Sequence, residues 1–282
     1  MGTFLAKERI NKSNKSNKIP PSSSSTDIDK EKFRYIEGRR FNNFQTSKYV
    51  LPNDDEECDR LHMQHFLMRY AWQGNFASPV EQILTGVDSK VLDVGCGAGS
   101  WSFEMATIYP NAKIIGVDIS PVQPSGIKPK NFTFFQADIT DGLPFADETF
   151  DFVFQRFLVG SIPKEKWFSV IKELTRMLKP GGYLELVEFD VLAESLGPTS
   201  YIFSNAYIKD EIKNIHGGIA EGKLGLAYND DMMRLYENVK VLLAPFMQVS
   251  HKEYDQMVKT TKEEWLERNS YTRFIRVHAR KI

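Results

Sequence analysis

Residues 90–99 read KVLDVGCGAG, a short apolar run that ends in three glycines spaced two residues apart. Apolar runs of this length that end at glycine are typical of buried strands. A glycine-rich turn between a strand and a helix lets backbone N–H groups approach a ligand closely, and the helix that follows turns its positive end toward that ligand. This stretch therefore predicts a binding site at the end of a buried strand.

Strand-like and helix-like segments alternate after this loop. The pattern predicts helices over 100–108 and 164–178, and strands over 112–117, 132–137, 150–154 and 183–187. Parallel strands connected by helices bury both faces of their sheet. We therefore predict an α/β fold, a doubly wound, mostly parallel and Rossmann-like sheet with helices on both faces, whose core spans 90–190.

The N-terminal part is predicted to form a tail and a lid. Residues 1–30 contain the run NKSNKSNKIPPSSSSTD, which offers almost no apolar surface to bury and is typical of a disordered segment. Within 31–89, Asn53–Glu56 and Ser78–Glu81 have the spacing of helix capping boxes. We therefore predict a helical lid over 31–89 that partly covers the site. The first of its helices is expected to have an apolar face made of Met63, Phe66, Leu67, Tyr70 and Ala71.

The C-terminal part, residues 191–282, is predicted to complete the same domain. Helices are expected over 197–214, 230–246 and 251–268, and the last of them opens with a capping box at Ser250–Glu253. Apolar and polar side chains alternate in the final segment, so a half-buried strand is expected over 272–279.

Polar residues stand at the ends of the predicted strands. Asp118 follows the second strand, Asp138 follows the third, and Gln155 ends the fourth. In a doubly wound fold, ligands bind at the carboxyl ends of the strands where the strand order reverses. The first carboxylate can accept both hydroxyls of a ribose, and the second can accept an adenine amino group. Asp93, just ahead of the glycine loop, is unfavourable beside a pyrophosphate but suits an ammonium group. The set therefore predicts S-adenosylmethionine as the cofactor.

The same segments resemble the class I S-adenosylmethionine-dependent methyltransferases. The stretches that match this family's successive motifs, within about 90–190, are VLDVGCGAGSW, IIGVDIS, QADITDGLPFADETFDFVF and LKPGGYLELVE. Upstream, Tyr49 to His65 resembles a fungal branch that includes methyltransferases like the secondary-metabolism regulator and the trans-aconitate type. Such proteins usually place a strand opened by Gly-Phe after the fifth strand, and none is visible here. We therefore expect a sheet of seven strands, or of six with an exposed edge.

The resemblance implies a role for each residue of the site. Asp93 and Gly95 would hold the methionyl amino group, to which Gln155 would add its backbone carbonyl. Asp118 would bind the ribose, Asp138 and the isoleucine after it would contact the adenine, and the later glycines would form the tight turn. The full set of predicted cofactor-binding residues is Asp93, Gly95, Cys96, Gly97, Gly99, Asp118, Ile119, Asp138, Ile139 and Gln155.

Methyl transfer from a sulfonium is an in-line displacement, to which alignment of the reactants contributes strongly. A carboxylate acceptor needs no general base, whereas a hydroxyl or an amine can need one. The candidate catalytic residues are His62, His65 and Arg156. For the histidines the alternative is a buried, hydrogen-bonded ring, and the arginine suits an acidic substrate or a structural ion pair equally well. The other histidines are scattered along the chain, so no metal site is predicted.

Composition narrows the cellular context. The chain has 282 residues, a formal net charge of −1 and only two cysteines, which is typical of a reducing compartment. A cytoplasmic location, with a nuclear one as the alternative, is therefore expected. A membrane-spanning helix is not expected, because the chain has no sufficiently long apolar run.

Three functions follow, in order of preference. The first is an S-adenosylmethionine-dependent methyltransferase acting on a small molecule, by O- or carboxyl-methylation. A nucleic-acid acceptor is disfavoured, because residues 155–158 read QRFL where base-methylating enzymes commonly carry Asn/Asp-Pro-Pro-Tyr/Phe, and no zinc knuckle is present. The second is a cofactor-binding regulatory protein without efficient turnover that acts through a protein partner. The third, an NAD(P)-dependent dehydrogenase, is disfavoured because the loop lacks the GxGxxG spacing.

Overall fold

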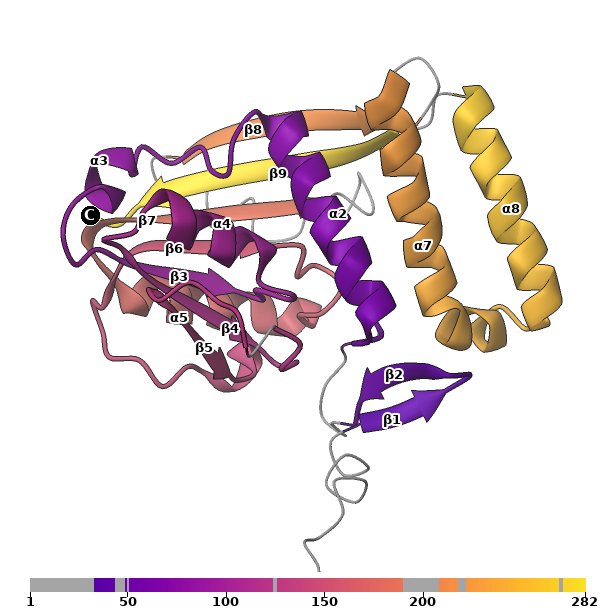
Figure 1. Cartoon of the computed structure of the whole chain (residues 1–282), viewed down its shortest axis with the longest axis horizontal. Helices are drawn as coiled ribbons and strands as arrows, with labels where there is room; N and C mark the ends of the chain where they lie inside the picture. The colour runs from indigo at the N-terminus through magenta and orange to yellow at the C-terminus, as the bar shows by residue number, and fades with distance from the viewer. Residues whose placement is uncertain are drawn as a thin grey trace, which may run out of the picture.

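The computed structural model describes residues 33–43, 49, 51–123, 126–189, 208–217, 222–268 and 271–282. The disordered tail predicted over 1–30 and the first part of the helix predicted over 197–214 lie outside the described residues. Figure 1 shows one central sheet with helices packed on it and a helical pair, α7 and α8, that extends beyond the sheet.

The described residues form a seven-stranded sheet with the strand order β5-β4-β3-β6-β7-β9-β8. The strands are β3 (Lys90–Val94), β4 (Lys113–Asp118), β5 (Phe132–Gln136), β6 (Phe150–Arg156), β7 (Leu178–Phe189), β8 (Ile208–His216) and β9 (Tyr271–Arg280). The first five strands in this order run parallel, and β9 pairs antiparallel with both β7 and β8. The predicted seven-stranded, doubly wound sheet is therefore confirmed.

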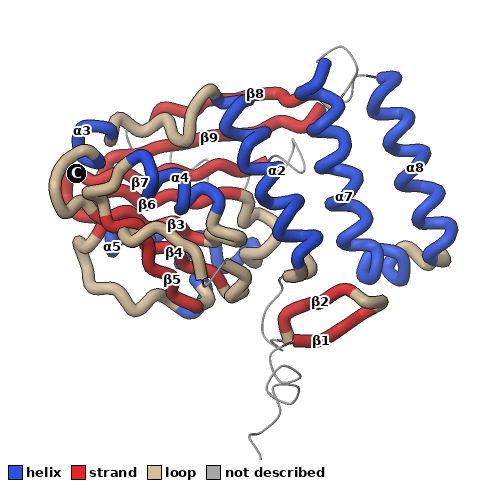
Figure 2. Tube along the Cα trace, viewed as in Figure 1, coloured by secondary structure: helices blue, strands red, loops and turns tan. Residues whose placement is uncertain are grey.

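Both faces of the sheet are covered, because side chains alternate along each buried strand. Leu92 and Val153 point to one side and pack with α5 (Trp167–Met177). Phe152 and Phe154 point to the other side, where the Phe154 ring stacks on Trp101 of α4 (Ser100–Ile108) at a centroid distance of 4.1 Å. Figure 2 shows these helices against the strands. This two-sided core fixes the carboxyl ends of β3, β4, β5 and β6 at one edge.

The N-terminal segment differs from the predicted all-helical lid. Residues 33–42 form a hairpin of β1 (Phe33–Ile36) and β2 (Arg39–Asn42), followed by α2 (Asp55–Trp72) and the short α3 (Glu81–Leu84). The predicted capping boxes are not formed. Asp54 caps α2 by accepting the N–H of Glu57, and the Ser78 hydroxyl donates to Glu185.

The buried face of α2 is also not the predicted one. Met63, Phe66 and Tyr70 are 55%, 56% and 65% exposed, whereas only Leu67 and Ala71 of the predicted face are buried. The helix turns charged residues inward because α7 (Gly222–Phe246) carries their partners, as described below. The apolar periodicity of the sequence alone therefore predicts the wrong face of α2 as the buried one.

The C-terminal third supplies the seventh strand. Residues 208–214, predicted as helix, belong to β8, which pairs with β9 over its whole length. The predicted helices over 230–246 and 251–268 and the final strand are confirmed in α7, α8 (His251–Arg268) and β9. The Ser250–Glu253 capping box is confirmed too, since each side chain accepts the other residue's backbone N–H. Within the described residues, none of the helices has the length and apolarity needed to cross a bilayer.

Candidate functional site

A cavity of about 340 Å³ opens at the carboxyl edge of the sheet. It lies beside the carboxyl ends of β3, β4 and β5. After β5 the chain crosses to the other side of β3 and forms β6, so the strand order reverses next to the cavity. Among the residues that line it are Gly95, Asp118, Ile119, Asp138, Ile139 and Tyr49. The structure thus brings half of the predicted cofactor residues, from three separate strand ends, around one space.

Asp118, at the end of β4, is held between two loops. Its Oδ2 accepts the N–H of Gly97 at 2.9 Å, and its Oδ1 accepts the N–H of Ser120 at 2.8 Å. An ionised carboxylate has about four acceptor positions, so each oxygen can accept a further hydrogen bond. Burial raises the pKa of Asp118, and its backbone donors oppose that shift. The group is therefore oriented in advance toward the cavity.

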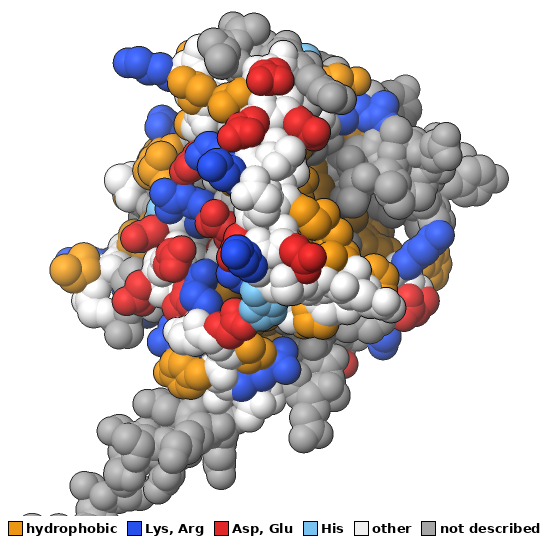
Figure 3. All heavy atoms as spheres, turned by 90° about the vertical axis from the view of Figure 1, so that its right-hand side faces the viewer, with side chains coloured by type: hydrophobic (Ala, Val, Ile, Leu, Met, Phe, Trp, Pro, Cys, Tyr) orange, Lys and Arg blue, Asp and Glu red, His pale blue; other side chains and the backbone are white. Residues whose placement is uncertain are grey.

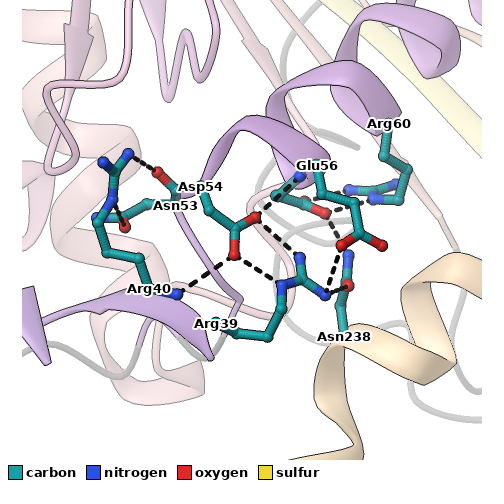
Figure 4. A network of polar contacts seen from close by, with 8 residues as sticks. Arg39, Arg40, Asn53, Asp54, Glu56, Arg60 and Asn238 are labelled. Atoms are coloured by element: carbon teal, nitrogen blue, oxygen red, sulfur yellow. Dashed lines mark hydrogen bonds and ion pairs between the residues drawn. The ribbon is translucent and has the colours of Figure 1, made fainter. Parts of the chain in front are cut away.

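A second polar network fixes the loop that follows Asp118. Asn42 of the hairpin donates to the Ser120 hydroxyl at 2.5 Å, and Asn53 donates to Asn42 at 2.7 Å. Arg39 of β2 donates to the Asp54 carboxylate and, at 2.6 Å, to the side-chain oxygen of Asn238 on α7. Figure 4 shows Arg39 reaching from the hairpin toward both helices. The hairpin, α2, α7 and the loop after β4 are thus joined.

Asp138 caps a 3₁₀ turn, η1 (Ile139–Asp141), directly after β5. Its Oδ1 accepts the N–H of Thr140 at 2.8 Å, and Ile139 beside it presents an apolar side chain to the cavity. A carboxylate next to an aliphatic side chain can hold a flat, amine-bearing ring by one hydrogen bond and one packed face.

The glycines of the loop have two different roles, close packing at Gly95 and the shape of the turn at Gly97 and Gly99. Gly95 has φ +69°, and a Cβ at this position would come within 2.6 Å of the Leu158 side chain, so a larger residue would collide with the cavity wall. Gly97 and Gly99 also have positive φ but shape the turn and do not line the cavity. Cys96 packs its sulfur against Gly116 of β4, and burial raises the pKa of its thiol well above the usual range. Cys96 therefore acts as an apolar filler.

Asp93 and Gln155 do not line the cavity. Asp93 accepts the Ser102 hydroxyl at 2.6 Å, and burial raises its pKa to about 7. Gln155 is fully buried beside Val94; its amide nitrogen donates to Glu188 at 3.4 Å, and its side-chain oxygen has no hydrogen-bond partner among the described residues. Their contacts with the methionyl group stay a prediction.

Asp93→Asn is expected to stabilise the unliganded protein increasingly as the pH rises. Because the folded pKa of about 7 exceeds the reference value of 3.8, the folded state binds the proton more tightly, and this contribution to stability is lost as the pH rises between these values. The difference in the free energy of unfolding between Asp93→Asn and the parent should grow by at most about 1.4 kcal/mol per pH unit between these two values. Urea unfolding of both proteins at several pH values measures it. A difference that does not change with pH contradicts the raised pKa.

The candidate catalytic histidines connect α2 to α4. His62 Nδ1 lies 2.6 Å from the Ser100 hydroxyl, and His65 Nε2 lies 2.7 Å from Glu104 Oε2. Burial, together with the charge of Arg156, lowers the pKa of His65 to about 4, so this ring is neutral near pH 7. Neither ring lines the cavity. For both histidines the geometry favours the hydrogen-bonded, structural alternative.

Arg156, at the end of β6, has a different environment. Its guanidinium lies over the Phe157 ring and 3.4 Å from His65 Nδ1, and no carboxylate within the described part of the chain forms an ion pair with it. Burial lowers its pKa to about 10, although Asp93 and Glu104 oppose this shift. The structural ion pair that the sequence allowed is therefore not formed, which leaves the guanidinium able to bind an anion. Like the two histidines, Arg156 does not line the cavity itself.

Two groups of residues at the site were not predicted as functional. Tyr49 lines the cavity, and burial and the charge of Asp118 raise its pKa well above the usual range. In the sequence it stands only at the start of the stretch that resembles the fungal branch, with no role assigned to it. Asn42 and Asn53 donate hydrogen bonds to Ser120, which stands 78 and 67 residues later in the chain. No local sequence pattern indicates contacts between residues so far apart. The described residues contain no cluster of three or more His, Cys, Asp or Glu that could hold a metal ion.

Comparisons with known proteins agree with this arrangement. A family model described as a methyltransferase domain matches residues 91–182. This segment is a methyltransferase domain. The match agrees with S-adenosylmethionine, the cofactor predicted from the sequence.

Curated relatives of this methyltransferase come from fungi. It is 35% identical over 164 residues to the methyltransferase pytC of Aspergillus terreus, covering 56% of this chain and 47% of that protein. It is 31% identical over 165 residues to the secondary metabolism regulator laeA of Aspergillus flavus, covering 57% and 42%. The chain thus spans about half the length of the curated relatives it matches. Among solved structures, phosphoethanolamine N-methyltransferase 2 of Haemonchus contortus is 19% identical with a TM-score of 0.46, covering 86% of this chain and 61% of that one.

Proposed function

We propose that this protein transfers the methyl group of S-adenosylmethionine to a small-molecule acceptor, through a hydroxyl or carboxylate oxygen. The observation that carries the proposal is the cavity at the ends of β3, β4 and β5. Its volume of about 340 Å³ falls within the range of small-molecule sites, about 300–1,000 Å³.

The residues of the cavity fit this cofactor. Asp118 is oriented to accept the ribose hydroxyls, and Asp138 to accept the adenine amino group while Ile119 and Ile139 pack on the ring. The absence of a side chain at Gly95 lets Leu158 pack against the end of β3 as a wall of the cavity. A carboxylate at the position of Asp118 suits the ribose of either cofactor. A nicotinamide dinucleotide is disfavoured by Asp93 just ahead of the glycine loop, which suits an ammonium group and not a pyrophosphate, and by the loop itself, which lacks the GxGxxG spacing.

The chemistry asks little of the protein beyond alignment. S-Adenosylmethionine supplies an already activated methyl group. The protein then has to hold the acceptor oxygen in line and exclude water, and no general base is needed when the acceptor is a carboxylate. Arg156 is the side chain we propose to orient an anionic acceptor, because a guanidinium binds a carboxylate through two parallel hydrogen bonds.

Isothermal titration calorimetry with S-adenosylhomocysteine and with NADH tests the cofactor assignment. We expect binding of the first and none of the second, and the reverse result would overturn the proposal. A panel of carboxylic acids, phenols and amines, with mass spectrometry of the products, then tests the acceptor class. Binding without any turnover would favour the regulatory alternative, which the chain's likeness to secondary metabolism regulators such as laeA also suggests. Methylation of protein alone would contradict a small-molecule acceptor.

Arg156→Leu is expected to raise the KM for a carboxylate acceptor by about tenfold or more, since a hydrogen bond to a charged group contributes about 1.5–3 kcal/mol. Affinity for S-adenosylhomocysteine should stay within about twofold, because Arg156 does not line the cofactor cavity. Arg69→Leu is the matched control, because Arg69 is half-exposed and already paired with Glu104 at 2.9 Å. Equal effects of the two substitutions on KM would contradict the assignment.

A further inference from the structure

The loop that follows β6 adopts a strained backbone. Phe157 has φ +61°, a conformation that is rare for a bulky side chain and that persists only where surrounding contacts enforce it. Its N–H donates to the carbonyl of Val187 on the neighbouring β7, at 3.0 Å. A conformation of this kind at the end of a central strand needs a neighbouring group that maintains it.

The carboxylate of Glu188 maintains this turn. Its Oε1 accepts the N–H of Leu158 and its Oε2 accepts the N–H of Val159, both at 3.0 Å. One oxygen is thus assigned to each of two successive backbone donors directly after Phe157. A carboxylate that accepts two N–H groups fixes the orientation of both peptide units.

Leu158 connects this turn to the cofactor cavity. It lines the cavity, and its side chain lies so close to Gly95 that a Cβ there would come within 2.6 Å of it. Leu158 therefore forms the wall that faces the glycine loop. A displacement of the turn would move this wall relative to Gly95.

We propose that Glu188 is a positioning residue for methyl transfer, which holds the turn at Phe157–Val159 and thereby seats Leu158 against Gly95 as a wall of the cofactor cavity. This inference rests on the proposed function of the cavity. Glu188 does not line the cavity, so it acts through the turn. Its other contact is the long hydrogen bond of 3.4 Å that it accepts from Gln155.

The same strand provides a matched control. Glu185 lies three residues earlier on β7, is fully buried, and also accepts two successive backbone donors, the N–H groups of Ala77 and Ser78, together with the Ser78 hydroxyl. The segment it holds precedes α3 and does not line the cavity. Glu185 and Glu188 therefore share their chemistry and differ in the loop they fix.

The test compares Glu188→Gln, Glu185→Gln and the parent protein by calorimetric titration with S-adenosylhomocysteine and by thermal unfolding. A glutamine keeps one acceptor oxygen but turns an NH₂ group toward the second backbone donor. We expect Glu188→Gln to weaken binding about tenfold and Glu185→Gln to change it less than about twofold, although both lower the melting temperature. Equal losses of affinity in the two variants, or parent-like affinity in Glu188→Gln, would overturn the inference.

Hydrogen exchange provides an independent measurement. The amides of Leu158 and Val159 should be protected in the parent and in Glu185→Gln, and should exchange faster in Glu188→Gln. Unchanged protection of these two amides contradicts the role of Glu188. If the parent fails to bind S-adenosylhomocysteine while the exchange pattern is as expected, then the proposed function is wrong, but the two hydrogen bonds by which Glu188 holds the turn are confirmed.

A second variant applies if Glu188→Gln does not fold. Leu158→Ala removes the wall and leaves Glu188 in place, and it is expected to weaken binding in the same way. Parent-like binding by Leu158→Ala would overturn the role of that wall.

Discussion

Arg60→Ala is expected to lower the free energy of unfolding by about 3–5 kcal/mol, the cost typical of removing one partner from a buried ion pair. The Arg60 guanidinium donates two hydrogen bonds to Glu57 and one, at 2.9 Å, to Asp231 on α7. All three side chains are at most 3% exposed. The substitution would leave two acidic groups buried without their cation.

Chemical unfolding measures this effect, and Arg234→Ala is the control. Arg234 pairs with Asp230 at 2.9 Å within α7, but both side chains are about half exposed. Figure 3 shows the side of the molecule on which α7 and α8 lie, with acidic and basic side chains intermixed at its surface. An exposed pair of this kind contributes about 0–1 kcal/mol. If the two substitutions cost the same, then the buried cluster does not stabilise the contact between α2 and α7.

Asp118→Ala is expected to weaken binding of S-adenosylhomocysteine by about 1–3 kcal/mol, which corresponds to a loss of about 5- to 150-fold. The variant removes the proposed acceptor of the ribose hydroxyls and also releases the N–H groups of Gly97 and Ser120. Asp151→Ala is the control. Asp151 accepts the N–H of Lys90 and pairs with Lys179, both at 2.8 Å, at the opposite edge of the sheet. It should lower the melting temperature and leave affinity unchanged.

A modified ligand separates a direct contact from a disturbed loop. The parent protein should bind the 2′-deoxy analogue of S-adenosylhomocysteine less tightly than the natural ligand, whereas Asp118→Ala should bind the two nearly equally. Such a cycle isolates the interaction between the carboxylate and the hydroxyl. A similar preference for the natural ligand in both proteins would contradict the ribose assignment.

The core over 90–190 could be predicted from the sequence because its signals are local. Each strand is a short apolar run, each is followed by a polar or glycine-rich turn, and α5 has a regular apolar face. The carboxylates Asp118 and Asp138 could be predicted for the same reason, since parallel strands bring their carboxyl ends to one edge. The order of parallel strands and helices along the chain is enough to predict that these two carboxylates lie near each other.

The flanking parts could not be predicted because their structure depends on distant partners. Ile208, Ile212 and Ile215 have the spacing of a helix face, but pairing with β9 makes this segment a strand. The inner face of α2 carries Glu57 and Arg60, which an apolar pattern assigns to the surface. In the sequence Asn42 resembles an ordinary surface residue and Asn53 a helix cap, and only the fold shows which side chains they hold.

The placement of β9 has a consequence for synthesis on the ribosome. β8 is made before α7 and α8, but in the described sheet it pairs only with β9, which is made after them. Until residues 271–280 emerge, the edge of β7 has no neighbour and β8 has no sheet to join. Unpaired edges of nascent chains are prone to aggregate, so this protein is most exposed to aggregation late in translation, after β8 has been made and before β9 has.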